Sequence, residues 1–219
     1  NALTGLSEHV GNWVGVTVDK KENAVKAEYT SSGKEVIAVD LPGAYSMSPF
    51  TNEETITSSY VKNENPDAII NIVDATNLSR SLFFTTQLLE LGIPVVVALN
   101  KSDINEKNGT KIDDKLLSER LGCAVVKTVA EKGENLKAVV EAAVKASGTK
   151  QEAPYKAGKA DVTKKAEIEA ADRARFDFVK ALVSEAEIKK AEVKEVSKSD
   201  KIDRIITHPV AGLVIFALV

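Results

Sequence analysis

The sequence has 219 residues, a formal net charge of −3 and 28% charged residues. That length can hold one α/β domain with a smaller appendage, and the near-neutral balance argues against a nucleic-acid-binding protein, which would carry a basic surface. The single cysteine, Cys123, lies in a mostly apolar stretch, so a disulfide within the chain is excluded and a buried thiol in a reducing compartment is expected.

Alternating apolar runs and helical patterns organise the first two thirds of the chain. In chain order, the sequence predicts a hairpin of residues 24–30 and 35–39 around the turn 31–34, a strand over 67–73, a helix from 77 or 79 to 91, a strand over 93–99, a helix over 112–121, a strand over 124–126 and a helix over 135–146. Strands that alternate with helices predict a doubly wound, mostly parallel sheet, to which the hairpin adds one antiparallel strand.

The composition changes near residue 148. Residues 147–154 are typical of a linker, and residues 160–196 are rich in Ala, Glu and Lys without Pro or Gly. Apolar or long side chains recur there at helical spacing, at Ile168, Ala171, Arg175, Val179, Leu182 and Ala186. We expect a small α-helical appendage of about two segments, whose charged residues form a solvated face or, alternatively, a surface for a partner.

Both ends of the chain look cut from a longer protein. The first residue is Asn1, and residues 210–219 are uncharged and mostly apolar. Ten residues cannot cross a bilayer, which takes about 20, so a buried terminal helix or strand is one interpretation. The charged flank at 201–204 and the pair His208-Pro209 favour the other, the opening of a membrane helix.

The motif Asn100-Lys101-Ser102-Asp103 follows an apolar strand. Asp103 can accept two parallel hydrogen bonds from N1–H and the exocyclic amine of guanine, whereas adenine offers no such donor pair. The stem of Lys101 can lie along the base while its ammonium stays in water, and Asn100 can tie neighbouring loops together. The alternative for this motif is a strand that ends in a polar turn.

A second motif, Asp40-Leu41-Pro42-Gly43, also follows an apolar strand. Asp40 can hold Mg²⁺ through a water, and the backbone N–H of Gly43 can approach a γ-phosphate. The alternative is an ordinary Pro-Gly turn. Because ligands of open α/β sheets bind beyond the carboxyl ends of the strands, we expect both motifs to meet around one nucleotide.

The chain resembles the FeoB family of bacterial ferrous-iron transporters over its whole length. The resemblance rests on residues 9–18, 40–46, 73–78, 91–103 and 202–209. It implies a P-loop GTPase-like fold over 1–148, a helical domain over 149–200 and the start of the first membrane helix over 201–219. Residues 1–5 match the helix that follows the family's phosphate-binding loop, so the first strand and the G-x-x-x-x-G-K-[ST] loop are not among these 219 residues.

The same resemblance assigns further residues. Thr17 matches the first-switch threonine that reaches Mg²⁺ and the γ-phosphate, and Gly43 shares the catalytic role. Residues Thr128, Val129 and Ala130 match the loop whose backbone contacts the guanine carbonyl, although a serine is more usual at position 129. The resemblance also implies GTP or GDP and Mg²⁺ as ligands, and raises K⁺ beside the phosphates, with its side-chain ligand in the loop that these residues lack.

The resemblance places this region on the cytoplasmic side of a bacterial inner membrane. Fe²⁺ would be the transported ion, carried by a membrane part outside this chain, and a small protein of the same transport system would be a partner. Many GTPases orient the attacking water with a Gln after D-x-x-G, but Ala44 stands here, so we expect slow GTP hydrolysis. The alternatives are a soluble ribosome- or RNA-associated GTPase, and a pseudo-GTPase that serves only as an interaction domain.

Overall fold

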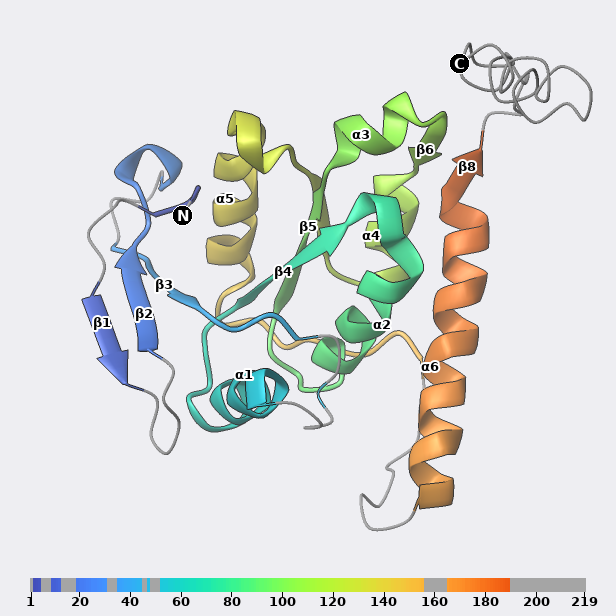
Figure 1. The fold of residues 1–219 in the computed structure, drawn as a ribbon, viewed down its shortest axis with the longest axis horizontal. Helices are drawn as coiled ribbons and strands as arrows, with labels where there is room; N and C mark the ends of the chain where they lie inside the picture. The colour runs from blue at the N-terminus through green and yellow to red at the C-terminus, as the bar shows by residue number, and fades with distance from the viewer. Residues whose placement is uncertain are drawn as a thin grey trace, which may run out of the picture. The chain divides into compact units, whose positions relative to one another are not determined.

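Three parallel strands form the centre of the fold. The computed structural model describes residues 2–4, 9–12, 19–30, 35–44, 47, 52–155 and 165–189. Within them, β4 (Ile69–Asp74), β5 (Val95–Asn100) and β7 (Ala124–Lys127) pair in the order β4-β5-β7 (Figure 1). β5 is the central strand of the three. It is apolar on both faces, as expected for a parallel strand that is covered on both sides.

Successive residues of β5 face opposite layers of helices. Val95, Val97 and Leu99 belong to the larger buried cluster, which contains side chains of α2 (Leu78–Leu89), α4 (Asp114–Leu121) and α6 (Lys165–Ala186). Val96 and Ala98 instead pack with Val139 of α5 (Leu136–Ala146). Helices on both faces of a parallel sheet confirm the predicted doubly wound α/β architecture.

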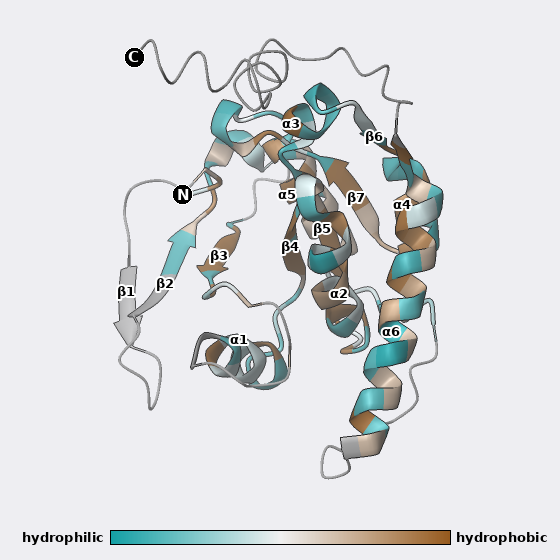
Figure 2. Ribbon diagram, turned by 45° about the vertical axis from the view of Figure 1, so that its right-hand side comes forward, coloured by the Kyte–Doolittle hydropathy of each residue, from teal (hydrophilic) through white to brown (hydrophobic). Residues whose placement is uncertain are grey.

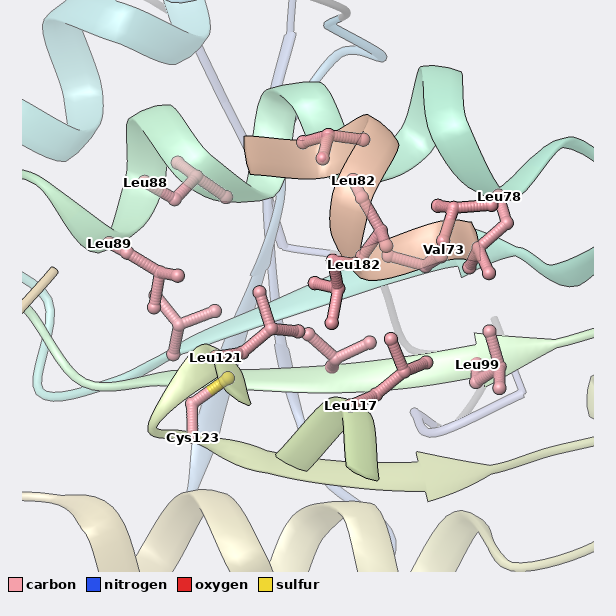
Figure 3. Packing of buried hydrophobic residues seen from close by; sticks show 14 of the residues in the cluster. Val73, Leu78, Leu82, Leu88, Leu89, Leu99, Leu117, Leu121, Cys123 and Leu182 are labelled. Atoms are coloured by element: carbon pink, nitrogen blue, oxygen red, sulfur yellow. The ribbon is translucent and has the colours of Figure 1, made fainter. Parts of the chain in front are cut away.

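The larger cluster holds α6 against the rest of the molecule. Figure 3 shows Leu82 of α2, Leu117 of α4 and Leu182 of α6 meeting over the sheet, and all three are fully buried. Cys123 lies at the edge of this cluster, and burial raises the pKa of its thiol to about 12. The predicted buried cysteine is therefore confirmed.

The predicted stripe on α6 is also confirmed, because Ala171, Val179, Leu182 and Ala186 are all buried. The described part of the appendage is a single 22-residue helix rather than two segments. The contacts divide the chain into residues 1–188 and 189–219, so α6 belongs to the first unit. The proposed domain boundaries at 148 and 200 stay predictions.

The N-terminal strands form a separate antiparallel sheet. It contains β1 (His9–Asn12), β2 (Asp19–Ala24) and β3 (Ile37–Asp40) in sequence order. The hairpin prediction was right for its second strand but wrong for its first, because β2 ends at Ala24 and Ala27–Tyr29 is a 3₁₀ turn, η1. No ladder joins β3 to β4 among the described residues.

The direction of β3 differs from that of the parallel sheet. Figures 1 and 2 show the β3 arrow pointing opposite to β5, and the loop after β3 runs toward α1 (Asn52–Asn63). Thr57 of α1 donates its hydroxyl to the carbonyl of Pro42 at 2.8 Å, which fixes that loop beside α1. The carboxyl end of β3 therefore lies away from the carboxyl end of β5.

Five short or polar elements were not expected from the sequence pattern. They are β1, α1, α3 (Ser102–Lys107), β6 (Thr110–Ile112) and β8 (Glu187–Lys189), the last two of which pair with each other. Two 3₁₀ turns, η2 (Ala75–Asn77) and η3 (Ala130–Lys132), complete the described elements.

Among the helices that the structure describes, none combines the length and apolarity that a membrane crossing requires. The predicted membrane segment 201–219 lies outside the described residues.

Candidate guanine-binding site

The motif that is predicted to recognise guanine begins where β5 ends. Lys101 has a left-handed backbone, with φ 62°, and directly precedes α3. Its carbonyl accepts the N–H of Asn105 at 3.1 Å, and the hydroxyl of Ser102 turns back to donate to the carbonyl of Leu99 at 2.7 Å. These local bonds fix the turn between β5 and α3, so Lys101 and Asp103 lie just beyond the carboxyl end of the strand.

Asn100 connects this turn to the loop after β7. Its Oδ1 accepts the backbone N–H of Ala130 at 3.0 Å and the hydroxyl of Thr128 at 3.5 Å. The N–H of Thr128 donates to the carbonyl of Leu99 at 2.9 Å. The structure therefore brings together the six residues predicted to recognise guanine: Asn100, Lys101, Asp103, Thr128, Val129 and Ala130.

A cleft opens beside these residues. It has a volume of about 170 Å³ and is lined by α3 residues that include Asp103, by Lys127, Thr128 and Val129, and by the two residues before α5. Thr128 is almost fully buried in its wall.

Asp103 is engaged by a lysine that the sequence analysis did not select. Lys132 Nζ lies 3.0 Å from Asp103 Oδ2, and Lys107 Nζ lies 4.0 Å from the same oxygen. The hydrogen bond from Lys132 is the main cause that lowers the pKa of Asp103. Lys132 sits in η3, followed by Gly133 at φ 71°, and no sequence motif marked it.

The polar groups of the residues predicted to contact the base are thus already bonded to other groups of the protein. Lys101 Nζ lies 2.7 Å from Asp74 Oδ2, the N–H of Val129 donates to Glu134 at 3.4 Å, and the N–H of Ala130 is bound by Asn100. A purine could bind only if its own groups replaced the partners of Asp103 and Ala130, whereas the bond between Lys101 and Asp74 leaves the stem of Lys101 available to the base. The Asp103 carboxylate is partly exposed, with 24% of its side chain accessible, and lines the same cleft as Thr128 and Val129.

Replacing Lys132 with methionine should raise the pKa of Asp103 toward its ordinary range. A lowered carboxylate pKa stabilises the folded state above the unfolded-state pKa, and this contribution is lost as the pH falls through the folded-state pKa. K132M should therefore weaken the acid dependence of stability. Carboxyl-carbon NMR during an acid titration measures the pKa directly. K107M is the matched control and should shift it less, because Lys107 is farther away; equal shifts in both variants would refute this assignment.

The two residues of the second motif are not brought to this group. Asp40 is exposed at the end of β3, and Gly43 is exposed with no atom within 4 Å of where a Cβ would lie. The expectation of one pocket is not met in this structure, because β3 has no ladder to the parallel sheet and runs the other way. Thr17, which is predicted to contact the phosphates together with Asp40 and Gly43, lies outside the described residues.

Asp74 is a second residue that the sequence analysis did not assign. It ends β4 and stands in register with Asn100 on β5. The signal that could have identified it is its position, since a carboxylate at the carboxyl end of the neighbouring parallel strand must lie next to the Asn-Lys-x-Asp turn.

Comparison with known proteins agrees with this arrangement. The family model described as ferrous iron transport protein B matches residues 1–143. The Fe(2+) transporter FeoB of Salmonella typhimurium is 46% identical over 143 residues, which is 64% of this chain and 18% of that protein. The FeoB of Escherichia coli K12 is 44% identical over the same share. The chain thus spans about a fifth of the length of these curated relatives.

Solved structures of FeoB cytosolic domains match as well. That of Legionella pneumophila (L. pneumophila) has a TM-score of 0.71 and 30% identity, covering 86% of this chain and 93% of that one. That of Thermotoga maritima (T. maritima) in its GMPPNP form has a TM-score of 0.77 and 25% identity, with the same coverage. These matches confirm the P-loop GTPase-like α/β fold, and the chain belongs to the family of ferrous iron transport protein B.

Proposed function

We propose that this chain is the guanine-nucleotide-binding, GTP-hydrolysing regulatory module of a ferrous-iron transporter. The observation that carries the proposal is the bond from Ala130 N–H to Asn100 Oδ1, which joins the two base-recognition loops at the ends of neighbouring parallel strands. A ribosome- or RNA-associated GTPase is not favoured, because the relatives are iron transporters and the charge balance is slightly acidic.

Base recognition would proceed by exchange of partners. The Asp103 carboxylate would leave Lys132 and accept N1–H and the exocyclic amine of guanine. Lys101 would supply an apolar stem along the base. Ala130 N–H would leave Asn100 and donate to the guanine carbonyl. Adenine cannot complete this set, because its edge has the opposite pattern of donors and acceptors.

The phosphate end of the site is part of the same proposal. Asp40 is an exposed carboxylate. Mg²⁺ in nucleotide sites is bound by one or two carboxylates together with the substrate phosphates, so Asp40 would be one protein ligand and Thr17 the second. Mg²⁺ would supply charge stabilisation for the γ-phosphate, and K⁺ beside the phosphates would add to it. Gly43 would offer its N–H to the γ-phosphate, which requires β3 to turn its carboxyl end toward the parallel sheet. Ala44 cannot orient water, so hydrolysis would be slow.

The wider role follows from the family. Fe²⁺ would be the cargo of a membrane part, this module would lie on the cytoplasmic side of the bacterial inner membrane, and a small protein of the same system would be a partner. These assignments rest on the relatives, of which the chain covers 18%.

The 219-residue chain alone should bind GTP only weakly, and no more tightly than it binds GMP, with or without Mg²⁺. These residues contain no G-x-x-x-x-G-K-[ST] loop, whose N–H groups and lysine hold the β- and γ-phosphates in such proteins. Calorimetry of GTP and GMP, each with and without Mg²⁺, tests this. Tight Mg²⁺-dependent GTP binding would show that these residues hold the phosphates by themselves. In a protein that joins this chain to such a loop, hydrolysis of GTP and not of ATP is expected.

A further inference from the structure

Asp74 uses its two carboxylate oxygens for two different tasks. Oδ1 accepts the backbone N–H of Thr76 at 2.9 Å and its hydroxyl at 2.7 Å, which caps η2. Oδ2 faces Lys101 Nζ at 2.7 Å. The Thr76 bonds fix the carboxylate plane, so the second oxygen is held in a defined place.

Lys101 is therefore fixed at both ends. Its left-handed backbone is held by the first turn of α3, through the bond from Asn105 N–H to its carbonyl at 3.1 Å. Its ammonium is held by Asp74 across the sheet, because β4 and β5 pair in register at this end. The four methylenes between these anchors have little freedom, although the side chain is about half exposed, at 49%.

We propose that Asp74 is a positioning residue for guanine recognition, which rests on the proposed function above. By holding the ammonium of Lys101, it presets the lysine stem as one wall of the base site. A long flexible side chain that is ordered only on binding costs affinity, and ordering it beforehand removes that cost. A purely structural ion pair as exposed as this one would instead contribute little to either binding or folding.

D74N separates these two roles. Asparagine keeps the oxygen that caps η2 through Thr76, and replaces the oxygen that faces Lys101 with an amide that cannot hold an ammonium. The thermal midpoint should therefore change little. GMP should bind about threefold to tenfold more weakly, the cost of ordering one long side chain.

A double-mutant cycle gives the decisive readout. K101M retains an apolar stem without the ammonium, so adding D74N to K101M should change GMP affinity no further. D114N is the matched control, because Asp114 makes an ion pair of the same 2.7 Å length with Lys127 without touching Lys101. The affinities are measured from amide chemical shifts during GMP titrations of the wild type, D74N, K101M, the double variant and D114N.

Three results would overturn the proposal. D74N could leave GMP affinity unchanged, or D74N could weaken binding equally in the wild-type and K101M backgrounds, or D114N could weaken it as much as D74N. If the wild-type chain shows no saturable binding of GMP at all, the proposed function itself fails, and the role of Asp74 fails with it.

Discussion

Replacing Arg175 with methionine should lower the free energy of unfolding by about 3 kcal/mol. The guanidinium is 13% exposed and bonds both oxygens of Glu90, at 2.9 and 2.7 Å, and Asp172 at 2.6 Å. Methionine preserves most of the stem but leaves Glu90, whose side chain is 27% exposed, and the more exposed Asp172 without their cation. Because Glu90 follows α2 and Arg175 lies on α6, the loss should also loosen the docking of α6.

Tyr155 belongs to the same network but cannot compensate for the loss of Arg175. Its hydroxyl lies 2.6 Å from Glu90 Oε1 and 2.7 Å from the carbonyl of Thr86, and its ring stacks on Phe178 with centroids 4.9 Å apart. Burial raises the pKa of Tyr155, so it remains a neutral donor. One hydroxyl cannot replace a bidentate cation for Glu90.

R120M is the matched control for R175M. Arg120 on α4 pairs with Glu185 on α6 at 2.7 Å, but both side chains are more than 40% exposed, at 42% and 43%. An exposed pair contributes about 0 to 1 kcal/mol. Urea unfolding followed by circular dichroism compares the two variants. Equal losses would mean that the Arg175 network contributes no more than a surface ion pair.

Replacing Asp103 with asparagine should invert the base preference from guanine to xanthine. Guanine presents two donors to the carboxylate, whereas xanthine presents the N1–H donor and a carbonyl acceptor. An asparagine amide matches the second pattern, with Oδ1 accepting N1–H and Nδ2 donating to the carbonyl. Hydrogen bonds to charged groups contribute about 1.5 to 3 kcal/mol, so XMP should bind D103N at least about tenfold more tightly than GMP does.

The same GMP and XMP titrations on D114N control for the loss of one negative charge near the cleft. Asp114 lies on α4 and pairs with Lys127, which lines the cleft. D114N should keep the preference for GMP. If D103N still prefers GMP, Asp103 does not read the base edge.

The sequence predicted the central sheet and its helices because their patterns are strong. β5 is a continuous apolar run, α5 has apolar residues at helical spacing, and Asp113 and Gly122 cap the start and the end of α4. α1 could not be predicted in the same way, because its segment is polar and Thr57 and Ser58 are buried as polar residues. Its helical state depends on tertiary packing, which overrides weak local preference.

The proximity of the residues predicted to recognise the base could be predicted because most of them are consecutive in the sequence and the strand ends bring their loops together. The role of Lys132 could not be predicted, because its side chain reaches Asp103 from a different loop of the chain. The meeting of Asp40 with Asp103 was predicted but is not found. The direction of β3 relative to β4 is set by strand pairing, and no pairing between them exists in the described part of the chain.

Asp103 and its neighbours should recognise guanine, and a titration of the 219-residue chain with GMP, IMP and AMP measures this preference. The amide of Ala130 is the reporter, because guanine binding must change its bond to Asn100. GMP should bind most tightly, IMP more weakly because it lacks the exocyclic amine, and AMP not measurably. Equal affinities for the three nucleotides, or no shift at Ala130 on GMP binding, would contradict the account.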